Sequence, residues 1–147
     1  MKAFFDYLGN ALDNLPAYVS LDFFGLTLDS AKTGYDLGIG QRLLDGQFAA
    51  DYLYPMAYPS HYADGYLGFG NPADHPYEVI RYGLKSARPL MEDGRARLRI
   101  WIQAFNLGAV YDGAKIRAQI RAVEEDQTVF GWLLWNARNV YGKEGLR

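Results

Sequence analysis

Aromatic and carboxylate side chains stand where short apolar runs of the chain end. Asp22 interrupts an apolar run near the N-terminus, and Tyr58 and His61 lie in a proline-rich aromatic segment, residues 54–62 (YPMAYPSHY). Aromatic rings offer flat surfaces on which sugars stack, and carboxyl groups act as acid, base or nucleophile when a glycosidic bond is cleaved. These residue types indicate a carbohydrate-binding cleft, with Asp22 as the leading candidate for catalysis.

Three further candidates stand at the ends of two other apolar runs. Gln103 could hydrogen-bond a sugar hydroxyl, and Trp135 could form a floor for a pyranose ring with Asn136 beside it. Each candidate also has a structural alternative. A buried amide can satisfy neighbouring backbone groups, an aromatic ring can fill the core, and Asp22 can brace a loop.

A second catalytic carboxyl group is not identifiable in the sequence. Glycoside hydrolysis usually needs two carboxyl groups that flank the scissile bond, one as acid and the other as base or nucleophile. Asp22 supplies one. We therefore expect no hydrolysis by this chain alone.

The sequence indicates no metal site and no cofactor. The chain has no Cys, and its two histidines lack a matching ligand set at zinc-binding spacing. The Gly38-x-Gly40 pattern precedes no phosphate-binding Lys.

Composition describes an ordinary globular chain of 147 residues, half of them hydrophobic, with a net charge of -2. That charge gives no reason to expect binding to nucleic acid or to an anionic membrane surface. The N-terminal segment reads as neither a signal peptide nor a membrane span, and the cellular compartment stays open. Twelve tyrosines, within an aromatic content of 16%, favour a pocket that stacks flat ligands.

Helix-period segments alternate with four strand-like runs, which begin near Tyr18, Asp51, Arg97 and Val129. This spacing predicts βα units and one parallel sheet. We expect helices over residues 4–15, 36–46 and 112–123, and another that starts at Pro76, is limited by Pro89 and belongs to a unit that ends at Asp93-Gly94. The strands should bring Asp22, Tyr58, Gln103 and Trp135 to the same carboxyl-terminal edge of the sheet.

The longest motifs resemble the putative glycoside hydrolase domain family known as domain of unknown function 4015. The matching segments include residues 19–25 (VSLDFFG), 54–62, 75–79 (HPYEV) and 131–136 (GWLLWN). The resemblance runs from about Leu15 to Tyr141. It implies a TIM (β/α)8 barrel, of which residues 1–147 form the C-terminal half with about four parallel strands. The fourth strand of such barrels, which commonly supplies a catalytic carboxylate, has no counterpart here.

Three interpretations stay open. In the first, the chain is half of a glycoside hydrolase-like barrel of carbohydrate metabolism that acts on a polysaccharide or oligosaccharide. In the second, it is a non-catalytic carbohydrate-binding fragment. In the third, it is a structural fragment that pairs with a missing N-terminal half or with a copy of itself. A half barrel would leave edge strands that recruit partners, so we expect the isolated chain to self-associate or to dissolve poorly.

Overall fold

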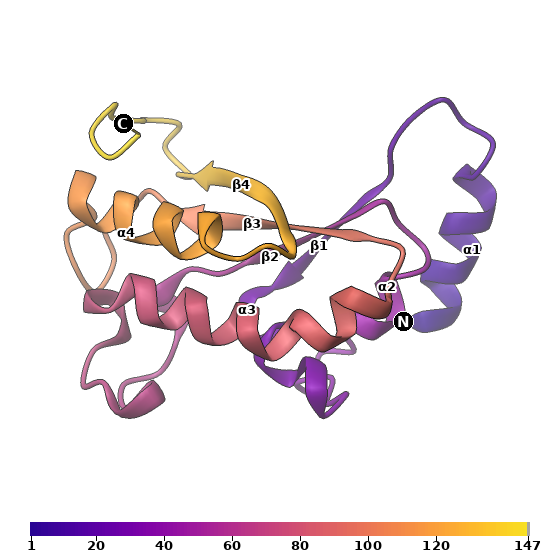
Figure 1. The fold of residues 1–147 in the computed structure, drawn as a ribbon, viewed down its shortest axis with the longest axis horizontal. Helices are drawn as coiled ribbons and strands as arrows, with labels where there is room; N and C mark the ends of the chain where they lie inside the picture. The colour runs from indigo at the N-terminus through magenta and orange to yellow at the C-terminus, as the bar shows by residue number, and fades with distance from the viewer. Residues whose placement is uncertain (147) are drawn as a thin grey trace.

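Four parallel strands form one sheet in the computed structural model, which describes residues 1–146 (Figure 1). The strands are β1 (Ser20–Phe24), β2 (Tyr52–Met56), β3 (Arg97–Gln103) and β4 (Val129–Trp135), and each pairs in parallel with the next in chain order. Helical segments lie between successive strands. The predictions of the strands, their order and their direction are confirmed.

Two long helices, α3 (Pro76–Asp93) and α4 (Gly113–Glu124), follow β2 and β3. Pro76 occupies the first turn of α3, where the missing N–H costs little. The side chain of Asp112 accepts a hydrogen bond from the backbone N–H of Lys115 (3.0 Å) and caps α4, as the sequence predicts. Apolar residues of both helices pack against one face of the sheet and form the core: Leu53, Ile80, Leu84, Leu98, Ile100, Ile102, Ile116, Ile120 and Val123.

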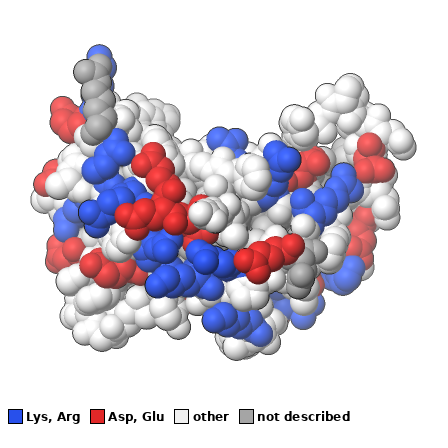
Figure 2. Space-filling view, in the orientation of Figure 1, with Lys and Arg blue, Asp and Glu red and all other residues white. Residues whose placement is uncertain are grey.

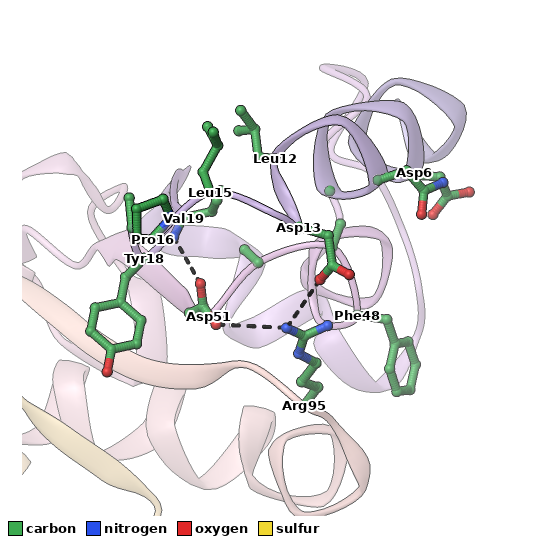
Figure 3. Close-up of a pocket in the computed structure, with 15 residues that line it drawn as sticks. Asp6, Leu12, Asp13, Leu15, Pro16, Tyr18, Val19, Phe48, Asp51 and Arg95 are labelled. Carbon is green, nitrogen blue, oxygen red and sulfur yellow. Dashed lines mark hydrogen bonds and ion pairs between the residues drawn. The ribbon is translucent and has the colours of Figure 1, made fainter.

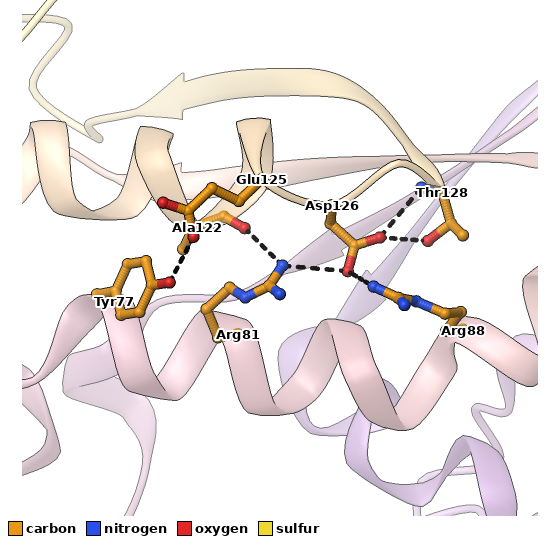
Figure 4. Close-up of polar contacts among 7 residues, drawn as sticks. All are labelled: Tyr77, Arg81, Arg88, Ala122, Glu125, Asp126 and Thr128. Carbon is orange, nitrogen blue, oxygen red and sulfur yellow. Dashed lines mark hydrogen bonds and ion pairs between the residues drawn. The ribbon is translucent and has the colours of Figure 1, made fainter.

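An ion-pair network joins these two helices to the start of β4 (Figure 4). Asp126 is 2% exposed and accepts from Arg88 (2.8 Å) and Arg81 (3.3 Å). Its other carboxylate oxygen accepts from the hydroxyl (2.6 Å) and the backbone N–H (3.0 Å) of Thr128. Arg81 and Arg88 thus both pair with Asp126, and this pairing fixes the α4–β4 turn against α3.

The helix expected over residues 36–46 is wrong in its first part, since α2 covers only Leu43–Gly46. Leu37, Gly38 and Gly40 have φ angles of 58°, 71° and 73°, a left-handed conformation that a right-handed helix cannot include. Asp36 accepts from the N–H of Gly38 (3.0 Å) and closes a turn rather than capping a helix.

The other two helix boundaries also differ from expectation. The first helix, α1, covers Lys2–Leu12 and ends three residues before Leu15, whose side chain is 54% exposed and gains no packing that would extend the helix. Pro89 does not limit α3, which continues to Asp93 with Gly94 after it, so the expected end of the unit at Asp93-Gly94 is confirmed. Pro89 lies on the exposed side of the helix, so water can reach the carbonyl of Lys85 that its ring leaves without a partner.

The opposite face of the sheet carries no such helix layer in residues 1–146 (Figure 1). We call it the open face. Its side chains alternate with those of the core: Ser20, Asp22, Phe24, Tyr52, Tyr54, Met56, Arg97, Arg99, Trp101, Phe130, Leu133 and Trp135. Parallel sheets are normally covered on both faces, so an uncovered face of this composition is unusual.

The two sides differ in surface character as well. Acidic and basic side chains intermingle over the helices, and the outline is hollowed above the sheet, between the C-terminal tail and α1 (Figure 2). No helix in the described part of the chain is long and apolar enough to cross a membrane.

Candidate functional site

Asp22 lies on β1 with its side chain on the open face, where it is exposed to solvent. Its Oδ1 accepts a hydrogen bond of 2.9 Å from the indole N–H of Trp101 on β3. The two residues are separated by the whole of β2 and α3 along the chain, and only the sheet brings them together. One carboxylate oxygen is therefore held in place on the open face.

Two further aromatic rings flank Trp101. Trp101 meets Tyr54 edge-on at 6.4 Å between ring centroids, and meets Trp135 edge-on at 5.9 Å. Trp135 ends β4 and is 41% exposed. The open face thus carries a continuous aromatic surface from Asp22 to the carboxyl-terminal end of β4, the kind of surface on which sugar rings stack.

Tyr58 and His61 lie in the loop that follows β2. Tyr58 is 4% exposed, and its ring meets those of His61 (5.3 Å) and Phe105 (5.5 Å) edge-on. Burial, and then the negative charge of Asp22, raise the pKa of Tyr58 well above its usual range. The hydroxyl therefore stays protonated near neutral pH and lies close enough to Asp22 to sense its charge, while His61 stays exposed at the rim.

Gln103 is fully buried, and its side-chain amide is engaged inside the fold. Its Oε1 accepts from the N–H of Ser60 (3.2 Å), and its Nε2 donates to the carbonyl of Phe105 (2.9 Å). Its backbone exchanges two hydrogen bonds with the side chain of Gln119. In this conformation Gln103 braces the loop that carries Tyr58, which is the structural alternative considered above.

Asn136 is similarly engaged. It is 8% exposed, and its Nδ2 donates to the carbonyls of Ala104 (2.6 Å) and Val140 (2.9 Å). Its Oδ1 accepts from the N–H of Arg138 (2.9 Å). The side chain therefore shapes the chain after β4 and supports the position of Trp135.

The register separates the candidates into two levels. Gln103 pairs with Trp135 at the strand ends, whereas Asp22 pairs with Tyr54, deeper along the sheet. Asp22 is thus brought to Trp101 and to the electrostatic reach of Tyr58, but it does not lie in the same row as Trp135.

The sequence reading did not count Trp101, Tyr54 or Arg99 among its candidates. Strict alternation along β3 places Arg99 and Trp101 on the same face as Gln103, and this alternation is visible in the sequence. What the sequence could not give is the neighbour across the sheet, here the contact between Trp101 and Asp22.

A cavity of about 770 Å³ opens at the other end of the sheet, beside α1 (Figure 3). Arg95 lies in it between Asp13 (3.7 Å) and Asp51 (3.8 Å), and Asp51 accepts from the N–H of Val19 (2.8 Å). Catalytic groups of (β/α) folds stand at the carboxyl ends of the strands, and this cavity lies at the amino ends. We assign it to the joining of α1 to the sheet rather than to chemistry.

No three His, Asp or Glu side chains within residues 1–146 are grouped as a metal site. His75 stacks on Phe69, with ring centroids 3.8 Å apart, and its carbonyl accepts from the N–H of Val79 in the first turn of α3. His75 is thus the residue that precedes the first turn of α3.

Comparison with known families gives one match. A family model described as a putative glycosyl hydrolase domain matches residues 1–141. Comparisons with curated proteins and with solved structures gave no match.

Proposed function

Because the chain belongs to the putative glycosyl hydrolase domain family, we propose that it forms the C-terminal half of a TIM (β/α)8 barrel that binds a polysaccharide or oligosaccharide. Residues 1–147 constitute one such half, and the sugar lies on the open face at the carboxyl ends of the strands. The observation that carries this proposal is Asp22, an exposed carboxylate fixed by Trp101 beside Trp135.

In this proposal Asp22 is the catalytic carboxylate of the half barrel. The hydrogen bond from Trp101 orients Oδ1, which leaves Oδ2 directed at a ligand as nucleophile, base or acid. Tyr58 keeps its proton because of burial and the charge of Asp22, so it serves as a hydrogen-bond donor to a sugar oxygen. Trp135 supplies the stacking surface, and His61 a contact at the rim.

The remaining two candidates act through these residues. The amides of Gln103 and Asn136 are engaged with backbone groups, so we assign them to holding the Tyr58 loop and the end of β4. A direct contact with sugar would require those hydrogen bonds to open.

Hydrolysis needs a second carboxyl group, which the proposal assigns to the half that covers the open face. The isolated chain would then bind sugar weakly and hydrolyse nothing. The unpaired outer edges of β1 and β4 favour association with that half, or self-association where it is absent.

A non-catalytic carbohydrate-binding fragment is the second candidate function. The observation that favours it is the exposed Trp135, which can stack a sugar without any help from Asp22. The two functions differ in what Asp22 does.

A glycan-binding screen of the chain tests both. We expect Trp135→Ala to abolish binding and Phe130→Ala to preserve it, because Phe130 is also exposed on the open face but lies at the other end of β4. No glycan binding by the unmodified chain would reject both candidate functions.

In an assembled barrel, Asp22→Asn should lower turnover more than binding, since the charge acts on the transition state. Unchanged turnover in that variant would favour the non-catalytic function.

A further inference from the structure

Two arginines of the open face have no acidic partner in the described part of the chain. Arg97 lies over the ring of Phe130, at 4.5 Å from its centroid. Arg99 lies 5.8 Å from the ring centroid of Tyr52 and 5.7 Å from that of Tyr54, and it donates to the hydroxyl of Tyr54 at 3.4 Å. The Nε of Arg99 is buried and has no hydrogen-bond partner.

Four arginines of the helix-covered face, in contrast, have acidic neighbours. Arg81 and Arg88 share Asp126, and Arg117 and Arg121 lie near Glu124 and Glu125. Among the open-face side chains of residues 1–146, Asp22 is the only carboxylate, and its Oδ1 accepts from Trp101. The open face thus holds two guanidinium groups against one carboxylate, of which one oxygen is already engaged.

Covering this face would enclose those charges. Taking a guanidinium out of water without an opposite charge costs several kcal/mol, whereas a carboxylate in bidentate contact offsets most of that cost. The covering surface must therefore bring carboxylates to the level of Arg97 and Arg99, in the rows of Tyr52 and Tyr54.

We propose that the open face of the sheet docks a second polypeptide layer that presents acidic side chains to Arg97 and Arg99. This inference rests on the half barrel proposed above and adds the charge of the missing partner. A second copy of this chain is the poorer occupant, because it would enclose four guanidinium groups with two Asp22 carboxylates.

An anionic saccharide is also a poorer occupant than an acidic polypeptide. The register places Arg99 in the row of Tyr54 and Asp22, and Arg97 in the row of Tyr52 and Ser20, two residues further from the carboxyl ends of the strands. A sugar bound at Asp22 would reach Arg99 but would leave Arg97 without an opposite charge.

A charge-reversed copy of the chain, Arg97→Glu/Arg99→Glu, serves as a model of the acidic partner. We expect sedimentation of a mixture with the unmodified chain to show a mixed dimer at least ten-fold tighter than either homodimer, and salt should weaken it. The matched control, Arg117→Glu/Arg121→Glu, has the same change of charge on α4 and should form no such dimer. Circular dichroism verifies that each variant is folded.

Three results would overturn the proposal: no mixed dimer, a homodimer of the unmodified chain as tight as the mixed one, or equal pairing with the α4 control. Saturable binding of an oligogalacturonate that Arg99→Met removes would also overturn it, in favour of an anionic saccharide. None of these measurements involves Asp22 or hydrolysis, so they fail or succeed independently of the proposed function.

A second variant covers the case in which the charge-reversed copy does not fold. Arg97→Met/Arg99→Met removes the repulsion between two open faces, and we expect it to self-associate at least ten-fold more tightly than the unmodified chain. Equal or weaker self-association would contradict the assignment of these two arginines to an acidic partner.

Discussion

The two faces of this sheet are built from the same four strands, yet they differ in the burial of their side chains and in the pairing of their charges. On the helix-covered face, Leu98, Ile100 and Ile102 are at most 1% exposed, and Asp126 is paired with two arginines. On the open face, Phe130 is 55% and Trp135 41% exposed, and Arg99 has no acidic partner. The burial and charge pairing of the helix-covered face are explained by their contribution to stability. The exposed rings and the arginine of the open face are not.

This contrast is the reason for which we propose the open face as the functional surface. Parallel sheets bury both faces because each strand otherwise exposes apolar surface to water. A face that keeps aromatic rings, a carboxylate and unpaired arginines in solvent is suited to contact with something outside residues 1–146. The predictions below test whether the two faces differ as sharply in energy as they do in geometry.

The largest effect is expected in the core. Ile100→Ala should lower the free energy of unfolding by about 4 kcal/mol, because it removes a fully buried side chain between the sheet and the helices. The matched change on the open face, Leu133→Ala, removes a half-buried side chain one strand away and should cost about 1 kcal/mol. Urea unfolding of both variants measures the difference, and equal losses would mean that the open face is packed in solution.

The ion-pair network should give the next largest effect. Asp126→Asn leaves Arg81 and Arg88 without their carboxylate and should cost about 2–3 kcal/mol, less than a fully buried pair because Arg88 is 40% exposed. Burial acts to raise the pKa of Asp126, but hydrogen bonds from Thr128 and Arg88 outweigh it and hold the pKa below its usual range. The stabilisation is therefore present above the unfolded pKa and disappears as the pH falls through the folded pKa. Thermal unfolding between pH 2 and pH 7 should show that loss in the unmodified chain and not in Asp126→Asn.

A smaller effect is expected at Asp29, a partly buried carboxylate that packs near α3 without a basic partner. Burial raises the pKa of Asp29 to about 6, and the hydrogen bond from the Tyr66 hydroxyl (2.6 Å) opposes this only in part. Its other oxygen is buried and unpartnered. The folded state holds the proton more tightly, so Asp29 reduces stability as the pH rises from about 4 to about 6.

Asp29→Asn removes that charge and still accepts from Tyr66. We expect it to raise the free energy of unfolding at pH 7.5 by about 1–2 kcal/mol and to leave it nearly unchanged at pH 4. The pH profile checks this, and a destabilised variant at pH 7.5 would contradict the assignment of the raised pKa.

The sequence was sufficient for the strands, their order and the helices after β2 and β3, because local periodicity and capping residues such as Asp112 agree with the tertiary packing. It failed over residues 36–42, where the positive φ angles of Leu37, Gly38 and Gly40 are decided by the path of the chain rather than by apolar spacing. The continuation of the α3 helix past Pro89 was also missed, because the exposure of Pro89 cannot be read from the residues alone.

The sequence predicted the types of residue in the candidate site but not the hydrogen bonds that those residues make. Strand alternation places Asp22 and Trp101 on one face, yet the hydrogen bond between them depends on the stagger of three strands. Gln103 and Asn136 looked like ligand contacts because they end strands. Only the positions of Ser60, Phe105, Ala104 and Val140 reveal that their amides are already engaged.

The smallest change in stability is expected at Asp22, the residue to which we assign catalysis. Asp22→Asn keeps an oxygen that can accept from Trp101, and the side chain is exposed, so the free energy of unfolding should change by less than about 0.5 kcal/mol. The chemically identical change at Asp126, on the other face, should cost several times more. Urea unfolding of the two variants side by side makes the comparison direct. If Asp22→Asn destabilised the chain as much as Asp126→Asn, Asp22 would be a structural brace. If it leaves stability unchanged, the carboxylate is held in place for a ligand or a partner.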